Sequence, residues 1–361
     1  MKKRIISLMA ALFLMASPLF AVSTVEAEQA QKYSYMFFGT FDTAISIIGY
    51  AKNKAAFDQV AAEAEGMFKR FHQLFNQYYP YEGLNNLYYL NNNAAKAPVQ
   101  VPQELFDLLA WCKTHQQDTR GQVNIALGAV LSLWHDEREN AEMNPGEAKL
   151  PEMEALQEAA QHTSIEDLVL DPEQSTVFYR DPKMKLDLGA VAKGYATELV
   201  AQYMLTTEMP NFIINAGGNV RAGHPPLDGR TAWGVSVQDP DAALVLPAGD
   251  DIMDILYLAD KSIVTSGDYQ RYFIVDDERY HHLISPFTLM PPHHMRSVTI
   301  ITQDSGLADL LSTAVFLMPF EEGFEYVNSL PGVDALWVLN DRSVKMTEGA
   351  AEIAYSAGYR P

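Results

Sequence analysis

The sequence predicts an α+β fold in which a mixed or antiparallel sheet forms the core and helices pack against it. Three observations support this prediction. Apolar residues recur with a three-four spacing between Phe57 and Phe75, which is the clearest helical pattern in the chain. Short strand-like runs separated by glycine and proline dominate the second half. The chain also lacks internal repeats and low-complexity segments.

The N-terminal residues 1–27 have the pattern of a secretory signal peptide. A cationic start, Lys2-Lys3-Arg4, precedes an apolar run over residues 5–14, and small residues follow, so cleavage is expected after Ala21 or Ala27. The run is too short to span a bilayer, which makes a membrane anchor the weaker interpretation. We therefore expect an extracytoplasmic protein, secreted or periplasmic, with residues 28–361 forming a single domain.

The mature chain is expected to be strongly acidic. The full sequence has a formal net charge of −20, and the signal peptide removes three cationic residues and one anionic residue, which leaves −22. Such a charge argues against nucleic acid and anionic membranes as partners. The only cysteine, Cys112, lies in a helical apolar pattern and is expected to be buried. A single cysteine allows no intrachain disulfide and no cysteine zinc site, and it lies too far from the cleavage region to carry a lipid.

The first half of the mature chain predicts two strands and then helices. Residues Tyr33–Tyr50 are typical of two strands that bend at Phe38-Gly39-Thr40. After the long helix, Tyr78–Asn93 is rich in Tyr and Asn and is expected to be an irregular loop, which either stacks on a flat ligand or simply covers the surface. Two further helices are expected to begin at Pro102 and Pro151, since proline favours the first helical position.

The segments between and after these helices are less regular. Residues 121–134 predict a loop and a helix capped by Asn124, and residues 140–150 predict a polar insertion or linker. From Leu168 onward the pattern changes to that of strands and a few helices. Strands are expected near 168–170, 176–180, 184–188, 212–215, 233–238, 255–258, 262–265, 272–275, 282–284, 296–302, 335–339 and 344–346, and helices near 307–318 and 321–329.

One strand–turn–helix segment has the features of an anion site. The expected strand 184–188 contains Asp187 and stops at Gly189, and a helical pattern follows. The N-terminus of a helix presents unpaired N–H groups and the positive end of the dipole. Lys193 adds a cation, and Gly194 allows a ligand to approach the backbone closely. The spacing matches neither the P-loop nor the dinucleotide fingerprint, so an ordinary strand–helix turn is an equal alternative.

A second candidate site lies on the helix expected from Leu307. Asp309 and Thr313 are four residues apart, so both oxygens lie on one face near the N-terminal end. One carboxylate and one hydroxyl make a poor zinc site but a partial shell for Mg²⁺, which prefers oxygen donors and leaves positions for water and phosphates. A surface Asp beside a capping-type Thr is the alternative, and spacing alone favours that alternative.

Histidines and further glycine turns complete the candidate residues. His281-His282 and His293-His294 lie close together in sequence, but adjacent histidines on a strand point to opposite faces, which weakens a transition-metal interpretation. A single histidine beside a phosphate, donating a hydrogen bond or moving a proton, is favoured. Glycine turns also follow two expected strands, at Ala216-Gly217-Gly218-Asn219 and at Ser266-Gly267-Asp268.

The order of these motifs resembles that of the ApbE-like family, the FAD:protein FMN transferases. The resemblance covers the chain from about Tyr35 to Tyr355, and its Ala-Lys-Gly-Tyr and Asp-x-x-x-Thr blocks are the most specific. The matching landmarks are, in order, Phe38-Gly39-Thr40, Gly121, Gly128 and Leu133-Trp134, Asp187 to Ala196, Asn215 to Val220, Trp233 and Gln238-Asp239-Pro240, Ser266-Gly267, His282 to Pro286, and Ala308 to Thr313. The resemblance implies a T-fold-related α+β architecture.

The resemblance also implies a reaction and its participants. A Ser or Thr hydroxyl of a target flavoprotein attacks the pyrophosphate of FAD, which leaves FMN attached through a phosphodiester and releases AMP. The implied Mg²⁺ ligands are Asp309, Thr313 and the backbone carbonyl of Ala190. The implied catalytic residues are Lys193, Asp309 and His282: the Mg²⁺ ion held by Asp309 and the Lys193 side chain would neutralise charge on the phosphates, and His282 is the implied proton carrier. The residues implied to lie along FAD are Phe38, Tyr78, Asp187, Gly189, Lys193, Asn215, Gly217, Gly218, Ser266 and His282.

The chain departs from many relatives at four positions without losing the metal pair. Phe38 stands where they have Met, Asn124 and Ser285 stand where they have Asp, and Leu289 stands where they have Gly. Two other functions remain as alternatives to transfer. One is hydrolysis of FAD to FMN and AMP, with water in place of the protein hydroxyl, and the other is FAD binding without turnover.

Overall fold

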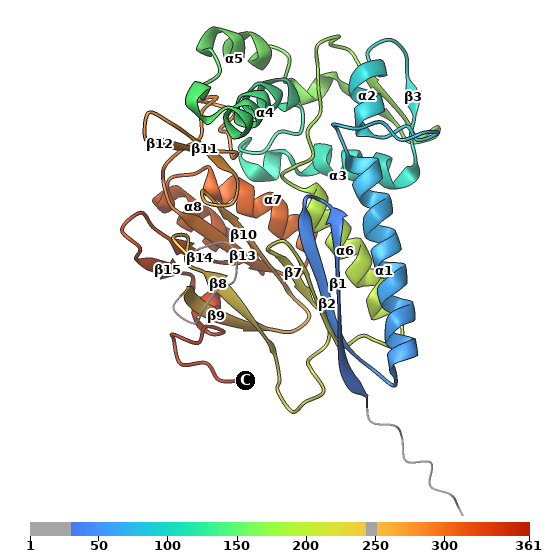
Figure 1. The fold of residues 1–361 in the computed structure, drawn as a ribbon, viewed down its shortest axis with the longest axis vertical. Helices are drawn as coiled ribbons and strands as arrows, with labels where there is room; N and C mark the ends of the chain where they lie inside the picture. Colours follow the sequence, from blue (N-terminus) through green and yellow to red (C-terminus); the bar gives the residue numbers. More distant parts are fainter. Residues whose placement is uncertain (1–29, 243–250) are drawn as a thin grey trace, which may run out of the picture.

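The computed structural model describes residues 30–242 and 251–361, and its centre is one eight-stranded sheet. Each strand pairs antiparallel with its neighbours, in the order β1-β2-β6-β7-β10-β13-β14-β15 (Figure 1). These strands are β1 (Gln31–Thr40), β2 (Thr43–Ala51), β6 (Phe212–Ala216), β7 (Asn219–Ala222), β10 (Ser262–Gly267), β13 (Ser297–Thr302), β14 (Asp334–Val338) and β15 (Val344–Met346). The predicted α+β class is confirmed.

Helices cover one face of this sheet. The long helix α1 (Lys54–Phe75) and α6 (Ala192–Leu205) share a core with β1, β2 and β6, while α7 (Ser305–Phe316) and α8 (Phe320–Ser329) share a core with β10, β13 and β14. The periodic residues Phe57, Phe68 and Leu74 are fully buried, as the apolar spacing of α1 predicts. The sheet therefore has a helical side on which α6 and α7 lie next to each other.

The opposite face of the sheet is covered by a hairpin, β8 (Trp233–Gln238) and β9 (Ile252–Leu258). Alternation along the strands supplies both cores, because successive side chains point to opposite faces. Ile300 packs with the helices, whereas its neighbour Ile301 packs with the hairpin. The sheet is thus buried on both sides over its centre.

A helical layer lies at one end of the sheet, at the top in Figure 1. Two small sheets accompany its helices and contribute to the same layer. The elements are α2 (Leu87–Asn93), α3 (Gln103–His115), α4 (Gly128–Met143), α5 (Met153–Ala160), a sheet of β3 (Val99–Gln100), β5 (Thr176–Tyr179) and β4 (Leu168–Asp171), and the hairpin β11 (Tyr272–Val275) and β12 (Glu278–His281). The short helix α9 (Glu348–Ala351) follows β15. Cys112 is a free, buried residue of α3, as predicted.

Several local predictions were wrong. The β1–β2 turn is formed by Phe41 and Asp42, both at φ 51°, and Gly39 instead lies in a bulge of β1 at φ 82°. The Asn-rich segment is partly helical, because Asn86 caps α2 by accepting a hydrogen bond from the Tyr89 amide. Asn124 does not cap α4, which begins four residues later; its side chain accepts from the Ala126 amide within the loop.

Strand boundaries differ at two places next to the candidate site. Residues 184–188 form no strand beyond a single bridge between Lys185 and Leu127, and the histidine strand is residues 278–281 rather than 282–284. Helix α4 continues to Met143, so of the polar segment predicted at residues 140–150 only residues 144–150 lie beyond the helix. The predicted signal peptide lies outside the described residues, and none of the helices in the described part is long and apolar enough to cross a membrane.

Candidate functional site

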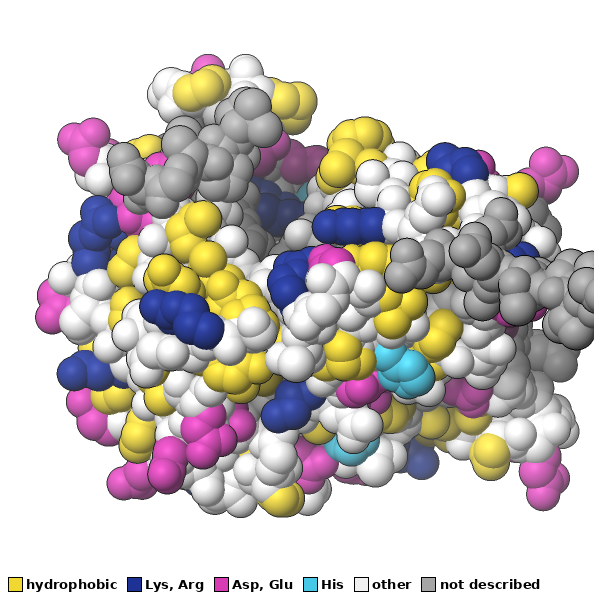
Figure 2. Space-filling view, turned by 90° about the horizontal axis from the view of Figure 1, so that it is seen from below, with side chains coloured by type: hydrophobic (Ala, Val, Ile, Leu, Met, Phe, Trp, Pro, Cys, Tyr) yellow, Lys and Arg dark blue, Asp and Glu magenta, His cyan; other side chains and the backbone are white. Residues whose placement is uncertain are grey.

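A cleft of about 1270 Å³ lies where the helical layer meets the large sheet and the β8–β9 hairpin. This exceeds the roughly 300–1,000 Å³ typical of small-molecule pockets, so a ligand of dinucleotide size is accommodated. The space-filling view shows a hollow in the surface with Lys and Arg side chains, and some Asp and Glu side chains, beside it (Figure 2). The predicted site residues that line the cleft are Tyr78, Asp187, Gly189, Ala190, Lys193, Asn215, Gly217, Gly218, Ser266, His282, Asp309 and Thr313.

Asp309 lies at the crossing of α6 and α7 and is almost fully buried, with 6% of its surface exposed. Its Oδ2 accepts a hydrogen bond from the Gly194 amide at 2.8 Å, and its Oδ1 accepts from Asn219 Nδ2 at 3.3 Å. Burial raises the pKa of this carboxyl, while Lys193 and the two hydrogen bonds act in the opposite direction. The alternative of a surface Asp is therefore wrong.

Gly194 is required by this crossing. A Cβ atom added to it would lie 2.4 Å from Asp309 Cβ and 2.4 Å from the Ser305 carbonyl oxygen. Only a residue without a side chain lets α7 approach α6 closely enough for the amide of Gly194 to reach the Asp309 carboxylate. The Ala-Lys-Gly-Tyr motif thus has a packing role at its glycine.

The turn before α6 leaves a carbonyl oxygen available. Helix α6 begins at Ala192, and the Gly194 amide, which a longer helix would direct to the Ala190 carbonyl, donates to Asp309 instead. Within residues 30–242 and 251–361 no donor is bonded to the Ala190 carbonyl or to the Thr313 hydroxyl. Asn219 Oδ1 is likewise a buried oxygen without a partner in that part of the chain. Asn219 is hydrogen-bonded to Asp309, Thr313 lies one turn further along α7, and Ala190 lines the same cleft, so these oxygens are candidate cation ligands.

The donor set consists of oxygens and contains one carboxylate. The described residues include no group of three or more His, Cys, Asp or Glu side chains that could hold a metal. A transition metal would favour nitrogen or sulfur ligands, whereas Mg²⁺ binds through one or two carboxylates and keeps several waters or phosphate oxygens. The residues present therefore fit Mg²⁺ and do not fit zinc.

Lys193 places a cation beside this carboxylate. Its Nζ donates to the Gly217 carbonyl oxygen at 3.1 Å, in the β6–β7 hairpin turn. Burial lowers the pKa of Lys193, and Asp309 opposes that shift. Gly217 and Gly218 have φ angles of 55° and 91°, which glycine adopts at little cost, so the predicted glycine turn is confirmed. The Lys193 motif and the Gly217 turn thus meet in space.

Three other predicted residues shape the cleft through their own hydrogen bonds. Asp187 Oδ1 accepts from the Gly189 amide at 2.7 Å and its Oδ2 accepts from Gln77 Nε2 at 2.5 Å, so this carboxylate holds the turn before α6. Asn215 Oδ1 accepts from the Gly218 amide at 3.0 Å. The hydroxyls of Ser266 and Ser312 are hydrogen-bonded to each other at 2.8 Å.

The two histidines of the His281-His282 pair have different environments. His281 Nε2 contacts the Pro292 carbonyl oxygen at 2.7 Å and its Nδ1 accepts from the Leu283 amide at 3.2 Å, so both nitrogens serve the fold. His282 lines the cleft, and its Nδ1 lies 3.2 Å from the Arg271 carbonyl oxygen. Burial and the Arg271 charge lower the pKa of His282 to about 3, so the imidazole is neutral at pH 7.

Phe38 is not among the residues that line the cleft. Its side chain is 68% exposed, because Phe37 occupies the core position of the alternating strand and the Gly39 bulge follows directly. Phe41 of the hairpin turn lines the cleft instead, edge-on to His72 with ring centroids 5.6 Å apart. Tyr78 does reach the cleft, stacked on His135 at 4.4 Å.

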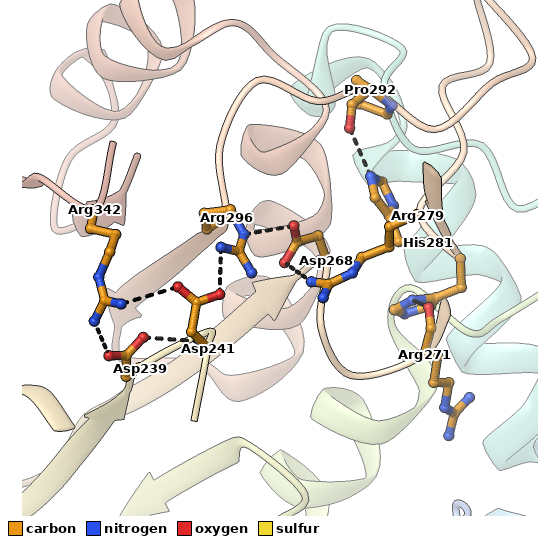
Figure 3. A network of polar contacts seen from close by, with 10 residues as sticks. Asp239, Asp241, Asp268, Arg271, Arg279, His281, Pro292, Arg296 and Arg342 are labelled. Atoms are coloured by element: carbon orange, nitrogen blue, oxygen red, sulfur yellow. Dashed lines mark hydrogen bonds and ion pairs between the residues drawn. The ribbon is translucent and has the colours of Figure 1, made fainter. Parts of the chain in front are cut away.

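Arg271 is a cleft residue that the sequence patterns did not reveal. It lies in the segment after Gly267, which an ion-pair network fixes in place: Arg296 binds Asp268 at 2.8 Å, and it also binds Asp241. In Figure 3 the Arg271 side chain extends away from this network. Its Nη2 lies 3.9 Å from Asp42 Oδ2 at the opposite hairpin turn. No spacing rule identifies such an isolated arginine.

The fold and the site together define an α+β protein whose cleft combines candidate oxygen ligands for a cation with a lysine and two glycine turns. The sequence model of the ApbE family matches residues 41–337, and the chain belongs to this family. The resemblance inferred from the motifs is therefore confirmed.

Curated relatives and solved structures agree with this assignment. The FAD:protein FMN transferase of Treponema pallidum is 33% identical over 276 residues, which are 73% of each chain. The enzyme of the same name from Klebsiella pneumoniae is 28% identical over 71% of this chain and 75% of its own length. The crystal structure of the ApbE protein from Thermotoga maritima superposes with a TM-score of 0.76 at 30% identity, over 90% of this chain and 99% of that one.

Proposed function

We propose that this protein is a Mg²⁺-dependent FAD:protein FMN transferase that attaches FMN to a Ser or Thr of a target flavoprotein and releases AMP. The observation that supports this most is the meeting of Asp309, Lys193 and the Ala190 turn in one large cleft. The names of the relatives support the same reaction class.

Asp309, Thr313 and the Ala190 carbonyl would hold the Mg²⁺ ion, with the unpaired Asn219 Oδ1 close by. When bound there, the ion would polarise phosphate oxygens and offset their negative charge. The Gly194 amide orients the Asp309 carboxylate through a hydrogen bond within the protein. A ligand that is already oriented lowers the cost of ordering the site on binding.

Lys193 and the turns would bind and orient the pyrophosphate of FAD. Lys193 is held by the Gly217 carbonyl beside Asp309, so its ammonium group can share the charge that develops on the phosphates. At the start of α6 the Ala192 and Gly194 amides already donate to the Leu188 carbonyl oxygen and to Asp309, so the Lys193 side chain is the main anion-binding group there. Arg271 extends the cationic lining toward the Phe41 turn.

In the reaction the hydroxyl oxygen of the target forms a bond to the phosphorus of the FMN half of FAD. The bond from that phosphorus to the bridging oxygen breaks, and AMP leaves with this oxygen. The proton of the hydroxyl would pass to His282, whose neutral imidazole can accept it. The negative charge of a bound pyrophosphate would raise the His282 pKa from its low value toward the working range.

The cellular location of the reaction is part of the proposal. The pattern of residues 1–27 supports export, and an exported transferase would modify an extracytoplasmic flavoprotein or a redox-complex subunit. The acidic surface supports neither nucleic acid nor an anionic membrane as a partner.

The test is to mix the protein with FAD, Mg²⁺ and a candidate target domain and to detect flavin fluorescence on a denaturing gel. A fluorescent target band is the expected result. FMN and AMP without a labelled band would indicate hydrolysis of FAD, and intact bound FAD would indicate binding without turnover.

A further inference from the structure

A second buried carboxylate, which does not line the cleft, joins the same three elements as Asp309. Glu198 of α6 is 8% exposed. Its Oε2 accepts from Arg221 Nε of β7 at 3.1 Å and from the Ser305 amide of α7 at 2.9 Å. Asp309 of α7, in turn, accepts from α6 and from β7. Each carboxylate therefore cross-links α6, β7 and α7.

The two cross-links are in register with each other. Glu198 lies four residues after Gly194, and Asp309 lies four residues after Ser305, so the members of each pair share a helix face one turn apart. On the strand, Asn219 and Arg221 are two residues apart and point to the same face. Of the two carboxylates, Asp309 lines the cleft, whereas Glu198 does not.

Stability alone does not explain a buried ion pair at this place. The side chains of Arg221 and Glu198 are 2% and 11% exposed. Removing two charges from water costs several kcal/mol per ion, and well-packed apolar residues of similar volume often give equal or greater stability. The pair does orient α7 relative to α6. The Glu198 carboxylate accepts a hydrogen bond from the Ser305 amide, one of the otherwise unpaired N–H groups at the start of α7.

We propose that Glu198 and Arg221 are positioning residues of the cation site. They fix the position of the N-terminus of α7 along the axis of α6. In that position the Asp309 carboxylate accepts hydrogen bonds from the Gly194 amide and from Asn219. One turn of slippage between the helices would remove both contacts. This inference rests on the proposed Mg²⁺ site at Asp309, and it makes no use of the flavin or the target.

The test compares Mg²⁺ binding in two variants with the unmodified protein. The first variant, Glu198→Gln, removes the carboxylate but leaves Arg221 as a buried unpaired charge. The second variant combines Glu198→Gln with Arg221→Met, so that no charge is buried at this place and the protein can fold. Mg²⁺ affinity is measured by calorimetry and by the Mg²⁺-dependent rise in melting temperature. Outer-shell partners typically contribute 10–100-fold to metal affinity, and we expect a loss of about tenfold or more in the folded double variant. Transfer activity should return at correspondingly higher Mg²⁺ concentrations.

A matched control is Glu65→Gln on α1, which removes a carboxylate bonded to Tyr35 and Lys69 outside the cleft. Its Mg²⁺ affinity should equal that of the unmodified protein. A folded double variant with unchanged Mg²⁺ affinity would overturn the inference, as would an unmodified protein that binds no Mg²⁺. If Mg²⁺ affinity falls as expected but no FMN is transferred by any form, the proposed function fails and the positioning role stands.

Discussion

The crossing of α6 and α7 gives the sharpest single-residue prediction, Gly194→Ala. The substitution keeps the backbone amide that donates a hydrogen bond to Asp309, and it adds one methyl group. That group would lie 2.4 Å from both Asp309 Cβ and the Ser305 carbonyl oxygen, and 3.0 Å from Asp309 Cγ. Because one of these atoms belongs to the backbone, the contact cannot be relieved by rotating a side chain, and α7 must move away from α6.

The expected size of the effect follows from two opposing contributions. Alanine in place of glycine in a helix is favourable by up to about 1 kcal/mol. Inserting a methyl group into a packed contact costs typically about 1–3 kcal/mol, and a backbone contact lies at the upper end. We expect a net loss of about 1–2 kcal/mol in unfolding free energy, together with a weaker Mg²⁺ site because the carboxylate moves with α7.

The assay is thermal unfolding of Gly194→Ala, with and without Mg²⁺, beside Gly66→Ala as a control. Gly66 lies in α1, and a Cβ there would meet no heavy atom within 4 Å. The control substitution should raise the melting temperature, since only helix propensity changes. The reasoning would be refuted if Gly194→Ala also raised the melting temperature and kept the Mg²⁺ affinity of the unmodified protein.

Three further predictions concern single side chains. Asp309→Ala should abolish Mg²⁺-dependent turnover, measured as AMP release, because it removes the only carboxylate of the donor set. Burial lowers the pKa of His281 from 6.5 to about 4 in the folded protein. As the pH falls, the unfolded chain therefore protonates His281 before the folded protein does. The unfolding free energy should consequently fall by up to about 3 kcal/mol between pH 6.5 and 4. Phe41→Ala should raise the KM for FAD, whereas Phe38→Ala should not, because only Phe41 lines the cleft.

Each of these predictions can be contradicted directly. Full activity of Asp309→Ala would remove the metal assignment. A His281→Gln variant that keeps the whole acid-dependent loss of stability would show that other groups cause it. A KM for FAD that rises for Phe38→Ala and stays constant for Phe41→Ala would place the exposed phenylalanine beside the flavin, as the sequence resemblance implies.

Much of the fold could be predicted because local patterns decide it. The spacing from Phe57 to Phe75 can bury one face only as a helix, and the Gly217-Gly218 pair suits a tight hairpin. Where two local signals compete, the prediction was wrong. Gly39 looked like the centre of a turn, but the positive φ it adopts serves a bulge, and the turn falls on Phe41 and Asp42.

Some residues of the candidate site could likewise be predicted from local motifs, and others could not. Asp309, Thr313 and Lys193 stand in motifs, so the sequence places them, although spacing alone could not show that Asp309 is buried. Arg271 and Asn219 contribute through tertiary contacts that join distant segments. The glycine of the Ala-Lys-Gly-Tyr motif suggested close approach of a ligand, yet the structure shows that its neighbour is a helix.

The central claim is that the Asp309 cleft transfers FMN to a protein hydroxyl, and intact-mass analysis of a target domain tests it most directly. With FAD and Mg²⁺ present, the target should gain the mass of one FMN linked through a phosphodiester, with one AMP released per FMN attached. A target whose acceptor Ser or Thr is replaced by Ala should gain none. An unchanged target mass while FMN and AMP accumulate would contradict the account.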